Sequence, residues 1–435
     1  MRRRLFIFTN VSNIVTKALF FLCATVLMGA GLAAAEDNPP QELTSKIQQA
    51  DFKISSVQNF TDEASLKTFV REAGSEMKLV LPNLSKFVED DYEYRGLAQY
   101  LGGSLLVKIT PEGRVSKLKL KDKAATVSGE NWAGFRGRFQ SVLLRSSGAQ
   151  MNFTSEGLEI VFSEGEAATI DVIYGFQDSN ETQITDVVDL KDLQYIQLPA
   201  WLRWIARGIE QLYKLIYDIA PLGWGFCLIL LAVFIKLAMA PLTALTSRFQ
   251  KEVNEHKSAL EPIFDDIKKN YKGEEAHKKT MAAYKARKIT PYYVLTPMLS
   301  TMIGLPILIA IFNMLGEVLP LKNSEFLWID SLAYPDKIGT LPFSIPFFGN
   351  ALNLLPFLMM LVTIVSTTSM NSPIANSREI SKQKRNLYLM AITFFFIFYN
   401  FPSGMVLYWT VVVFLQLIFD KFITRSYDSN LDSSV

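Results

Sequence analysis

The sequence predicts a polytopic α-helical membrane protein that also carries an exported, mainly β domain. The helical part is predicted by five apolar segments in the second half of the chain, near residues 222–245, 293–316, 350–370, 387–400 and 405–423. The β domain is predicted by shorter segments in the first half, where apolar and polar residues alternate as in half-buried strands. Hydrophobic residues make up 49% of the 435 positions, which suits a chain with both parts.

The chain begins with a basic and then apolar segment that is typical of export. Three arginines at positions 2–4 precede an apolar run over residues 18–35. Two interpretations remain open: Ala33 and Ala35 fit the cleavage site of a signal peptide, whereas about eighteen apolar residues also suffice for a retained transmembrane anchor. Both interpretations place the chain from residue 36 onward on the exported side.

Residues 36–199 have the composition of a folded exported domain. We expect a helical part over 62–76 and 84–100, followed by the strand-like segments SLLVKIT, VSKLKLK, LEIVFSE and TIDVIYGF. Turn sequences such as PEG at 111–113 separate these segments, which favours an antiparallel, β-sandwich-like domain. No catalytic pattern is visible in this domain, so a binding or scaffolding role is expected.

Residues 200–220 predict an amphipathic helix. Apolar residues recur every three or four positions, starting with Leu202, Ile205 and Ile209, and charged residues occupy the opposite face. Trp201 and Trp204 belong to a residue type that favours membrane interfaces. We therefore expect this helix to lie on the exported membrane surface.

The loops between the apolar segments differ in charge. Residues 248–288 carry eleven Lys and Arg against seven Asp and Glu, whereas residues 319–349 carry only two basic residues. The positive-inside rule then places both termini in the cytoplasm, with six spans, or five if the first is removed. Residues 248–288 predict a cytoplasmic helical hairpin whose basic excess suits anionic lipids or a ribosomal surface. Residues 425–435 predict a short cytoplasmic tail.

The fourth apolar segment, 387–400, is short for a span. Its length corresponds to roughly 21 Å of helix, against a hydrocarbon core of about 30 Å. We therefore expect the membrane to be thinner there. The alternative is that the helix starts earlier and Lys384 and Arg385 extend toward the interface.

Catalytic groups are missing from the apolar segments. The two histidines, His256 and His277, lie in the predicted cytoplasmic hairpin. Glu317 and Asp420 sit at the ends of predicted spans, and no Asp or Glu lies further inside one. This pattern argues against an intramembrane protease and against a proton-coupled transporter, which uses buried carboxylates. The sequence therefore predicts no enzyme, no cofactor or metal site, and no nucleic-acid binding.

One cation interrupts the first apolar segment, in the stretch LAVFIKLAMAPLT. A charge such as Lys236 at the centre of a span costs roughly 2.5–3.5 kcal/mol on insertion-based scales. On the order of 15 Å of helix separates it from Ser247, further than a lysine side chain reaches. Lys236 is therefore expected to face water, a partner or a wet cavity, and Pro241 predicts a helix kink just below it.

Six segments resemble, in order, those of the YidC/Oxa/Alb family of membrane protein insertases. They are GWGFCLILLAVFIKLAMAPLT (223–243), EPIFDDI (261–267), AAYKARKITP (282–291), LPILIAIFNML (305–315), FLWIDSLAYPD (326–336) and FPSGMVLYW (401–409). The resemblance covers about residues 200–424. An exported domain behind a first span is similar to the Gram-negative members, in which residues corresponding to 1–35 are retained as an anchor.

The resemblance implies a five-helix insertase core over residues 221–424 with a hydrophilic groove, open to cytoplasm and lipid and closed on the exported side. Lys236 stands where the family has a groove arginine, which keeps the charge but loses the planar fork. Seven further residues are expected in this groove, namely Ser300, Thr301, Asn313, Thr363, Tyr408, Trp409 and Thr410. A simpler interpretation of each polar group is that it forms hydrogen bonds between helices.

The function implied by the resemblance is insertion and chaperoning of small membrane proteins in the bacterial inner membrane, alone or with the Sec translocon. Expected partners are nascent membrane proteins, the Sec translocon, membrane lipids and, through the basic hairpin, the ribosome. A small-solute transporter or channel is the alternative, and a scaffold whose exported domain binds envelope proteins is a third. Because the groove segments all follow residue 200, deletion of residues 60–185 is expected to preserve insertion.

Overall fold

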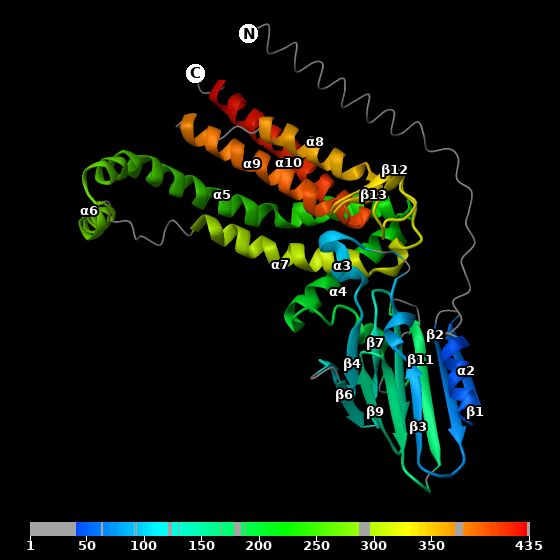
Figure 1. Ribbon diagram of the computed structural model, residues 1–435. Coiled ribbons are helices and arrows are strands. Elements are labelled where there is room, and N and C mark those ends of the chain that lie inside the picture. The colour runs from blue at the N-terminus through cyan, green and yellow to red at the C-terminus, as the bar shows by residue number, and fades with distance from the viewer. Residues whose placement is uncertain are drawn as a thin grey trace.

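The computed structural model describes residues 41–432 apart from 62–63, 91, 93, 121–123, 129, 166, 178–183, 187, 287–295 and 370–376. Side chains are not described at 61, 244–259, 261–262, 265, 268, 296–303, 377–380, 382–383 and 420–432. A β-rich part precedes a helical part that begins at α4 (Ala200–Ile219), and the β-rich part projects from one end of the helices (Figure 1). The predicted anchor or signal peptide, 1–35, lies outside the described residues.

Two antiparallel sheets form the β-rich part. The larger sheet has the order β1-β2-β11-β8-β7-β4-β5, with β1 (Lys53–Thr61), β2 (Ala64–Arg71), β11 (Ala168–Phe176), β8 (Gln140–Ser146), β7 (Trp132–Arg136), β4 (Leu105–Ile109) and β5 (Val115–Lys117). The smaller sheet has the order β3-β10-β9-β6, with β3 (Met77–Pro82), β10 (Gly157–Phe162), β9 (Ala149–Thr154) and β6 (Ala124–Ser128).

One hydrophobic core joins the two sheets into a sandwich. Phe153 and Ile160 of the smaller sheet share this core with Phe69, Val142 and Ile170 of the larger sheet. All five side chains are almost completely buried, and burial of each such side chain contributes roughly 1.5–3 kcal/mol. Alternation along the strands, as in TIDVIYGF, therefore predicts the mainly β domain correctly.

The helices expected over 62–76 and 84–100 are wrong. The first region forms β2, which pairs with β1 on one side and with β11 on the other, and then β3 begins at Met77. The second region contains only short helical turns, at Leu84–Phe87 and Gly96–Ala98, and the four-residue helix α3 (Gln99–Gly102). Strand pairing on both edges of β2 outweighs the weak helical spacing of its sequence.

The helical part consists of long helices and one β-hairpin. Its elements are α4 (Ala200–Ile219), α5 (Trp224–Asn270), α6 (Gly273–Ala286), α7 (Thr296–Glu317), the hairpin β12 (Lys337–Ile345) and β13 (Gly349–Asn353), α8 (Leu355–Ser369), α9 (Ser377–Phe398) and α10 (Ser403–Asp432). α9 begins at Ser377, well before residue 387, which is the earlier helix start that the alternative interpretation of this segment gives. The thinner membrane stays a prediction. α10 continues through residues 425–432 of the predicted tail.

Helix α4 is amphipathic, as its sequence predicts. Leu202, Ile209 and Tyr213 are buried, whereas Trp201 and Trp204 are exposed. The buried face packs against α7 and α5.

Among the described residues, one helical segment, Trp224–Thr243 of α5, is both long enough and apolar enough to cross a membrane. Shorter apolar helices cover Gly304–Glu317, Leu355–Ser369 and Ser403–Phe419. α5 packs against α7 and α10, and α8 packs against α9 and α10. The ring of Phe312 on α7 stacks on that of Phe398 on α9, with centroids 5.6 Å apart.

Candidate functional site

Lys236 lies on α5 and reaches α10. Its Nζ donates a hydrogen bond to Oε1 of Gln416 at 2.5 Å, and the lysine is half-buried. A hydrogen bond from an ammonium group is stronger than one between neutral groups. The amide oxygen of Gln416 is an uncharged acceptor that orients the ammonium group.

The bundle is packed tightly at the end near the sandwich and more loosely beyond it. On α5, Leu228, Leu231 and Ala232 are buried, whereas Phe234 and Leu237 are exposed. α10 shows the same change, since its residues from 403 to 408 are buried and those from 411 to 416 are only half-buried. Lys236 lies one turn past Ala232, which ends the buried stretch in the first part of α5.

Thr363 and Thr410 are bonded within their own helices. Their hydroxyls donate to the carbonyl oxygens of Met359 and Val406, at 2.8 and 2.7 Å. These bonds match the simpler interpretation of such polar groups, since a hydroxyl in a helix commonly bonds to the carbonyl four residues earlier.

Tyr408 and Trp409 belong to an aromatic cluster. Trp409 contacts the rings of Phe312 on α7 and Phe394 on α9, with centroids 6.3 and 5.1 Å apart. Tyr408 is buried and meets Phe312 edge-on at 6.5 Å. The cluster therefore closes the space between α7, α9 and α10 on the side of the sandwich.

Asn313 does not accompany Lys236. Its Oδ1 accepts from Nε2 of Gln197 at 3.0 Å, and its Nδ2 donates to the Ile309 carbonyl at 2.8 Å. Asn313 is roughly 6 Å of helix from the end of α7 at Glu317, whereas Lys236 is roughly 18 Å from the start of α5. The two residues thus lie at different depths in the bundle.

Three further residues were predicted from the sequence, namely Ser300, Thr301 and Pro241. The side chains of Ser300 and Thr301 lie outside the described part of the structure. Pro241 is exposed, and α5 continues through it, so the kink remains a prediction.

Sequence reasoning missed a buried polar contact between the sandwich and the bundle. Arg136, at the end of β7, forms an ion pair with Glu317 at the end of α7, and their side chains are 3% and 2% exposed. Arg138 donates to the carbonyl of Gly316 at the end of α7, and its charge is 3.7 Å from Asp90. We call Arg136, Arg138, Asp90 and Glu317 the arginine junction.

The junction is held by further hydrogen bonds. Arg138 also donates to the Ala333 carbonyl at 2.9 Å and to the hydroxyl of Tyr94, while Tyr94 and Tyr334 donate to Asp90 at 2.8 and 2.6 Å. Burial raises the pKa of both tyrosines above its ordinary value, so they remain protonated donors. Two cations at the end of α7 also stabilise the negative end of its helix dipole.

The sequence at the end of β7 carries a weak signal for this junction. Arg136 ends β7, and Arg138 lies two positions later in the bend before β8, so the two cations are close together in the sequence. Glu317 is visible in the sequence as a carboxylate at the end of an apolar segment. Nothing in the sequence pairs these three residues, which are far apart along the chain.

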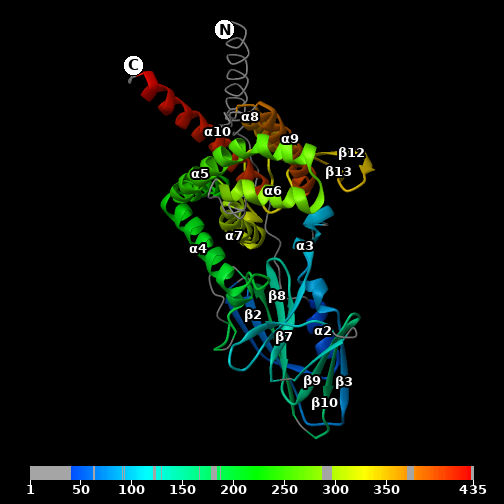
Figure 2. The same ribbon diagram turned by 90° about the vertical axis from the view of Figure 1, so that its left-hand side faces the viewer.

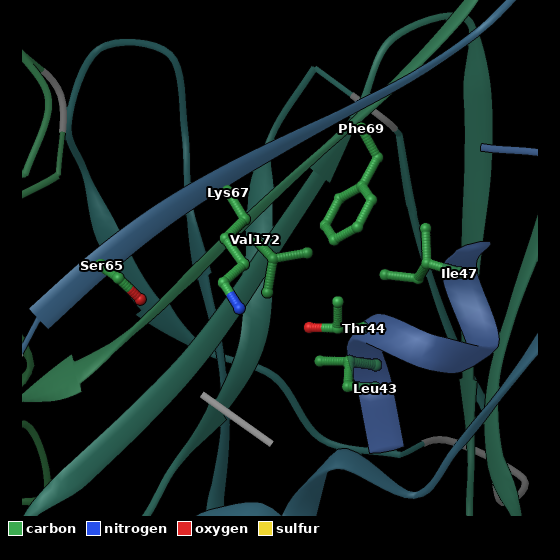
Figure 3. Close-up of a pocket in the computed structure, with 7 residues that line it drawn as sticks. All are labelled: Leu43, Thr44, Ile47, Ser65, Lys67, Phe69 and Val172. Carbon is green, nitrogen blue, oxygen red and sulfur yellow. The ribbon is translucent and has the colours of Figure 1, made fainter. Parts of the chain in front are cut away.

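A separate small recess lies in the sandwich, between α2 (Gln41–Gln49) and the larger sheet. Leu43, Thr44 and Ile47 line one side, and Ser65, Lys67, Phe69 and Val172 the other (Figure 3). The Lys67 side chain runs toward α2, and desolvation by burial lowers its pKa.

Comparison with known proteins assigns the helical part to a family. A family described as 60Kd inner membrane protein matches residues 215–430. A membrane protein insertase YidC of Chlamydia caviae is 34% identical over 215 residues, which cover 48% of this chain and 26% of the relative. The corresponding protein of Bacteroides fragilis is 31% identical over 252 residues, covering 56% and 39%, and that of Leptospira interrogans is 34% identical over 207 residues, covering 47% and 31%. The chain thus spans well under half the length of these relatives.

Proposed function

Residues 215–430 belong to the 60Kd inner membrane protein family, and from this premise we propose that the chain is a membrane protein insertase that also assists folding. The relatives named membrane protein insertase YidC supply the class of activity. The contact between Lys236 and Gln416, placed where the close packing of the bundle ends, is the observation that carries the proposal to particular residues.

In this proposal the loosely packed part of the bundle is a hydrophilic groove that faces the cytoplasm and lipid. Lys236 attracts the polar or acidic part of an inserting chain, and the attraction is stronger than in bulk water because lipid walls lower the local dielectric. Gln416 holds the ammonium in place without cancelling its charge. The apolar part of the substrate then moves into lipid, so no covalent step is needed.

The packed end of the bundle forms the seal on the exported side. Trp409 and Tyr408 contribute the aromatic part of this seal through Phe312. Asn313, bonded to Gln197, belongs to the seal and not to the wet groove. Thr363 and Thr410 line the transition between the two parts as groups that are already hydrogen-bonded.

The proposed topology has α5, α7, α8, α9 and α10 as the five-helix core of a bacterial inner-membrane protein. An N-terminal anchor and both termini lie on the cytoplasmic side, with the sandwich in the periplasm and α4 on the exported surface. The hairpin of α5 and α6 receives substrates in the cytoplasm and contacts anionic lipids or the ribosome. Its nascent membrane-protein substrates arrive directly or from the Sec translocon.

Cysteine labelling tests the groove. In a Cys23→Ser, Cys227→Ser background, Lys236→Cys should react with a membrane-impermeant thiol reagent from the cytoplasmic side alone. The matched control is Ala232→Cys, one turn earlier on α5 and fully buried, which should not react from either side. A folded protein whose Lys236→Cys is unreactive, or reacts from the exported side, would contradict the groove.

Depletion separates the proposal from a small-solute transporter. Loss of the protein should deplete small one- and two-span proteins from the inner membrane, measured by quantitative proteomics. An unchanged membrane proteome with loss of a solute uptake would favour the transporter.

A further inference from the structure

The hairpin of β12 and β13 exposes apolar side chains on a short two-stranded sheet. Phe347 at its tip is 85% exposed and Phe343 on β12 is 61% exposed, and Ile338 and Leu352 are also exposed. A two-stranded hairpin is at best marginally stable in water by itself. We therefore expect lipid or protein to cover the apolar surface of the hairpin.

At the tip of the hairpin, Phe347 has a backbone conformation that a bulky residue rarely adopts. The N–H of Phe348 donates to the Ile345 carbonyl at 3.1 Å, which makes Pro346 and Phe347 the central residues of a tight turn. Phe347 has a φ of +68°, a value that glycine or asparagine normally supplies at this turn position. A bulky side chain in this conformation is strained, so folding of the turn alone does not explain the ring.

Hydrogen bonds and a ring contact join the hairpin to the bundle. Nδ2 of Asn400 donates to the Phe347 carbonyl at 2.6 Å, and the hydroxyl of Tyr399 donates to the Ala351 carbonyl at 2.9 Å. The ring of Phe348 packs on that of Tyr399 with centroids 4.6 Å apart. Successive rings thus alternate, with Phe348 turned to the bundle and Phe347 turned away.

The surroundings of the hairpin point to lipid as the occupant. β12 and β13 extend sideways beyond α9, on the opposite side of the bundle from α4 (Figure 2). Exposed apolar side chains of the adjoining helices, Phe357 on α8 and Phe396 on α9, continue this surface. The sequence from 338 to 377 contains no charged residue, which suits lipid better than a polar protein partner.

We propose that the hairpin of β12 and β13 lies in the exported leaflet of the membrane, with Phe343 and Phe347 among the acyl chains of its phospholipids. This inference rests on the membrane placement in the proposed function. The unpaired backbone groups at the edges of the hairpin keep it near the headgroups, because hydrocarbon leaves such groups unsatisfied. Together with α4 on the other side, it fixes the depth of the bundle in the bilayer.

Fluorescence quenching tests the inference in the full chain. In the Cys23→Ser, Cys227→Ser background, Phe347→Cys is labelled with an environment-sensitive fluorophore and reconstituted into phosphatidylethanolamine–phosphatidylglycerol vesicles. Phospholipid that carries a spin label close to its headgroup should lower the fluorescence of this label at least twofold. Iodide in the aqueous phase should not quench it. Val80→Cys on β3, which is 59% exposed, is the matched control and should be quenched by iodide alone.

A third label separates the possible failures. Leu361→Cys on α8 is exposed on the flank of the bundle and should be quenched by spin-labelled lipid if that flank faces lipid. If Leu361→Cys is quenched by lipid and Phe347→Cys is not, the hairpin inference is overturned and the proposed function stands. If neither is quenched by lipid, the membrane placement itself fails. Protection of Phe347→Cys from both quenchers means that a protein covers the hairpin, which also overturns the inference.

A substitution without any label provides a second measurement. Phe347→Gly relieves the backbone strain but removes the ring, so the protein should fold at least as well in detergent. In lipid nanodiscs, amide hydrogen exchange over residues 338–353 should become at least threefold faster than in the unmodified chain. Unchanged exchange in nanodiscs would contradict insertion of the hairpin.

Discussion

Breaking the ion pair of the arginine junction tests how firmly the sandwich and the bundle are joined. In Arg136→Met, the Glu317 carboxylate loses its cation but still accepts from the backbone N–H of Tyr195 at 2.8 Å and from Gln197 at 2.6 Å. Removal of one partner of a buried ion pair costs about 3–5 kcal/mol. Because two donors remain on Glu317, we expect a loss of about 3 kcal/mol, at the lower end of that range.

Glu317→Leu should cost more, about 5 kcal/mol, because it also leaves the buried N–H of Tyr195 without its acceptor. Arg136 keeps two neutral partners in that variant, since its Nε donates to Gln177 at 3.1 Å and its Nη1 donates to Gln197 at 3.4 Å. The double variant Arg136→Met, Glu317→Leu removes both charges together. Its cost should be at least about 2 kcal/mol below the sum of the two single costs, because neither charge is left alone.

Thermal unfolding of the full chain in mild detergent measures these costs. At about 2–4 °C per kcal/mol for a domain of this size, Arg136→Met should lower the unfolding temperature by about 6–12 °C. The control is Lys78→Met, which breaks a surface ion pair to Glu159 of 2.9 Å and should cost below about 1 kcal/mol. Single variants no worse than this control, or a strictly additive double variant, would refute the reasoning.

Three further predictions concern the same two parts of the chain. Deletion of residues 60–185 removes both arginines of the junction, so the truncated chain should unfold at a lower temperature than the full chain. It should still insert substrates, and complete loss of insertion by a folded truncation would give the sandwich a larger role. Lys67→Met should raise the unfolding temperature of the sandwich at pH 7, because the lowered pKa means that the charged form is disfavoured on folding. The gain should shrink as the pH rises toward 10.5, where the unfolded chain also loses this charge, and a gain that does not depend on pH would contradict the cause. The raised pKa values of Tyr94 and Tyr334 predict that stability is retained below pH 10 and falls as the pH rises above it, because the unfolded chain then releases protons that the folded chain keeps. Between pH 9 and 11, the unfolding temperature of the double variant Tyr94→Phe, Tyr334→Phe should fall less than that of the unmodified chain. An equal fall in both proteins would contradict the assignment.

Local periodicity predicted the elements whose burial follows their own sequence. The alternation in TIDVIYGF gives β11, and the three- and four-residue spacing from Leu202 gives α4. The same reasoning failed over residues 64–71, because pairing with two neighbouring strands decides the conformation of β2.

The candidate site was predictable only in part. A lysine in an apolar segment is conspicuous by its cost, so Lys236 could be identified without a structure. Its partner Gln416 is 180 positions away, and Arg136 and Glu317 are also far apart in sequence, so no local pattern could pair them. Asn313 is a similar case, since its partner Gln197 is also far away in the sequence.

Reconstituted insertion tests the central claim most directly. Purified protein in phospholipid vesicles should raise the protease-protected fraction of a small one-span substrate with an acidic tail, compared with vesicles without protein. Lys236→Arg should retain this activity, and Lys236→Glu should lower it at least tenfold for the acidic-tailed substrate but much less for one with a neutral tail, because only the acidic tail is repelled. Equal protection with and without the protein, or an activity that Lys236→Glu leaves unchanged for both substrates, would contradict the account.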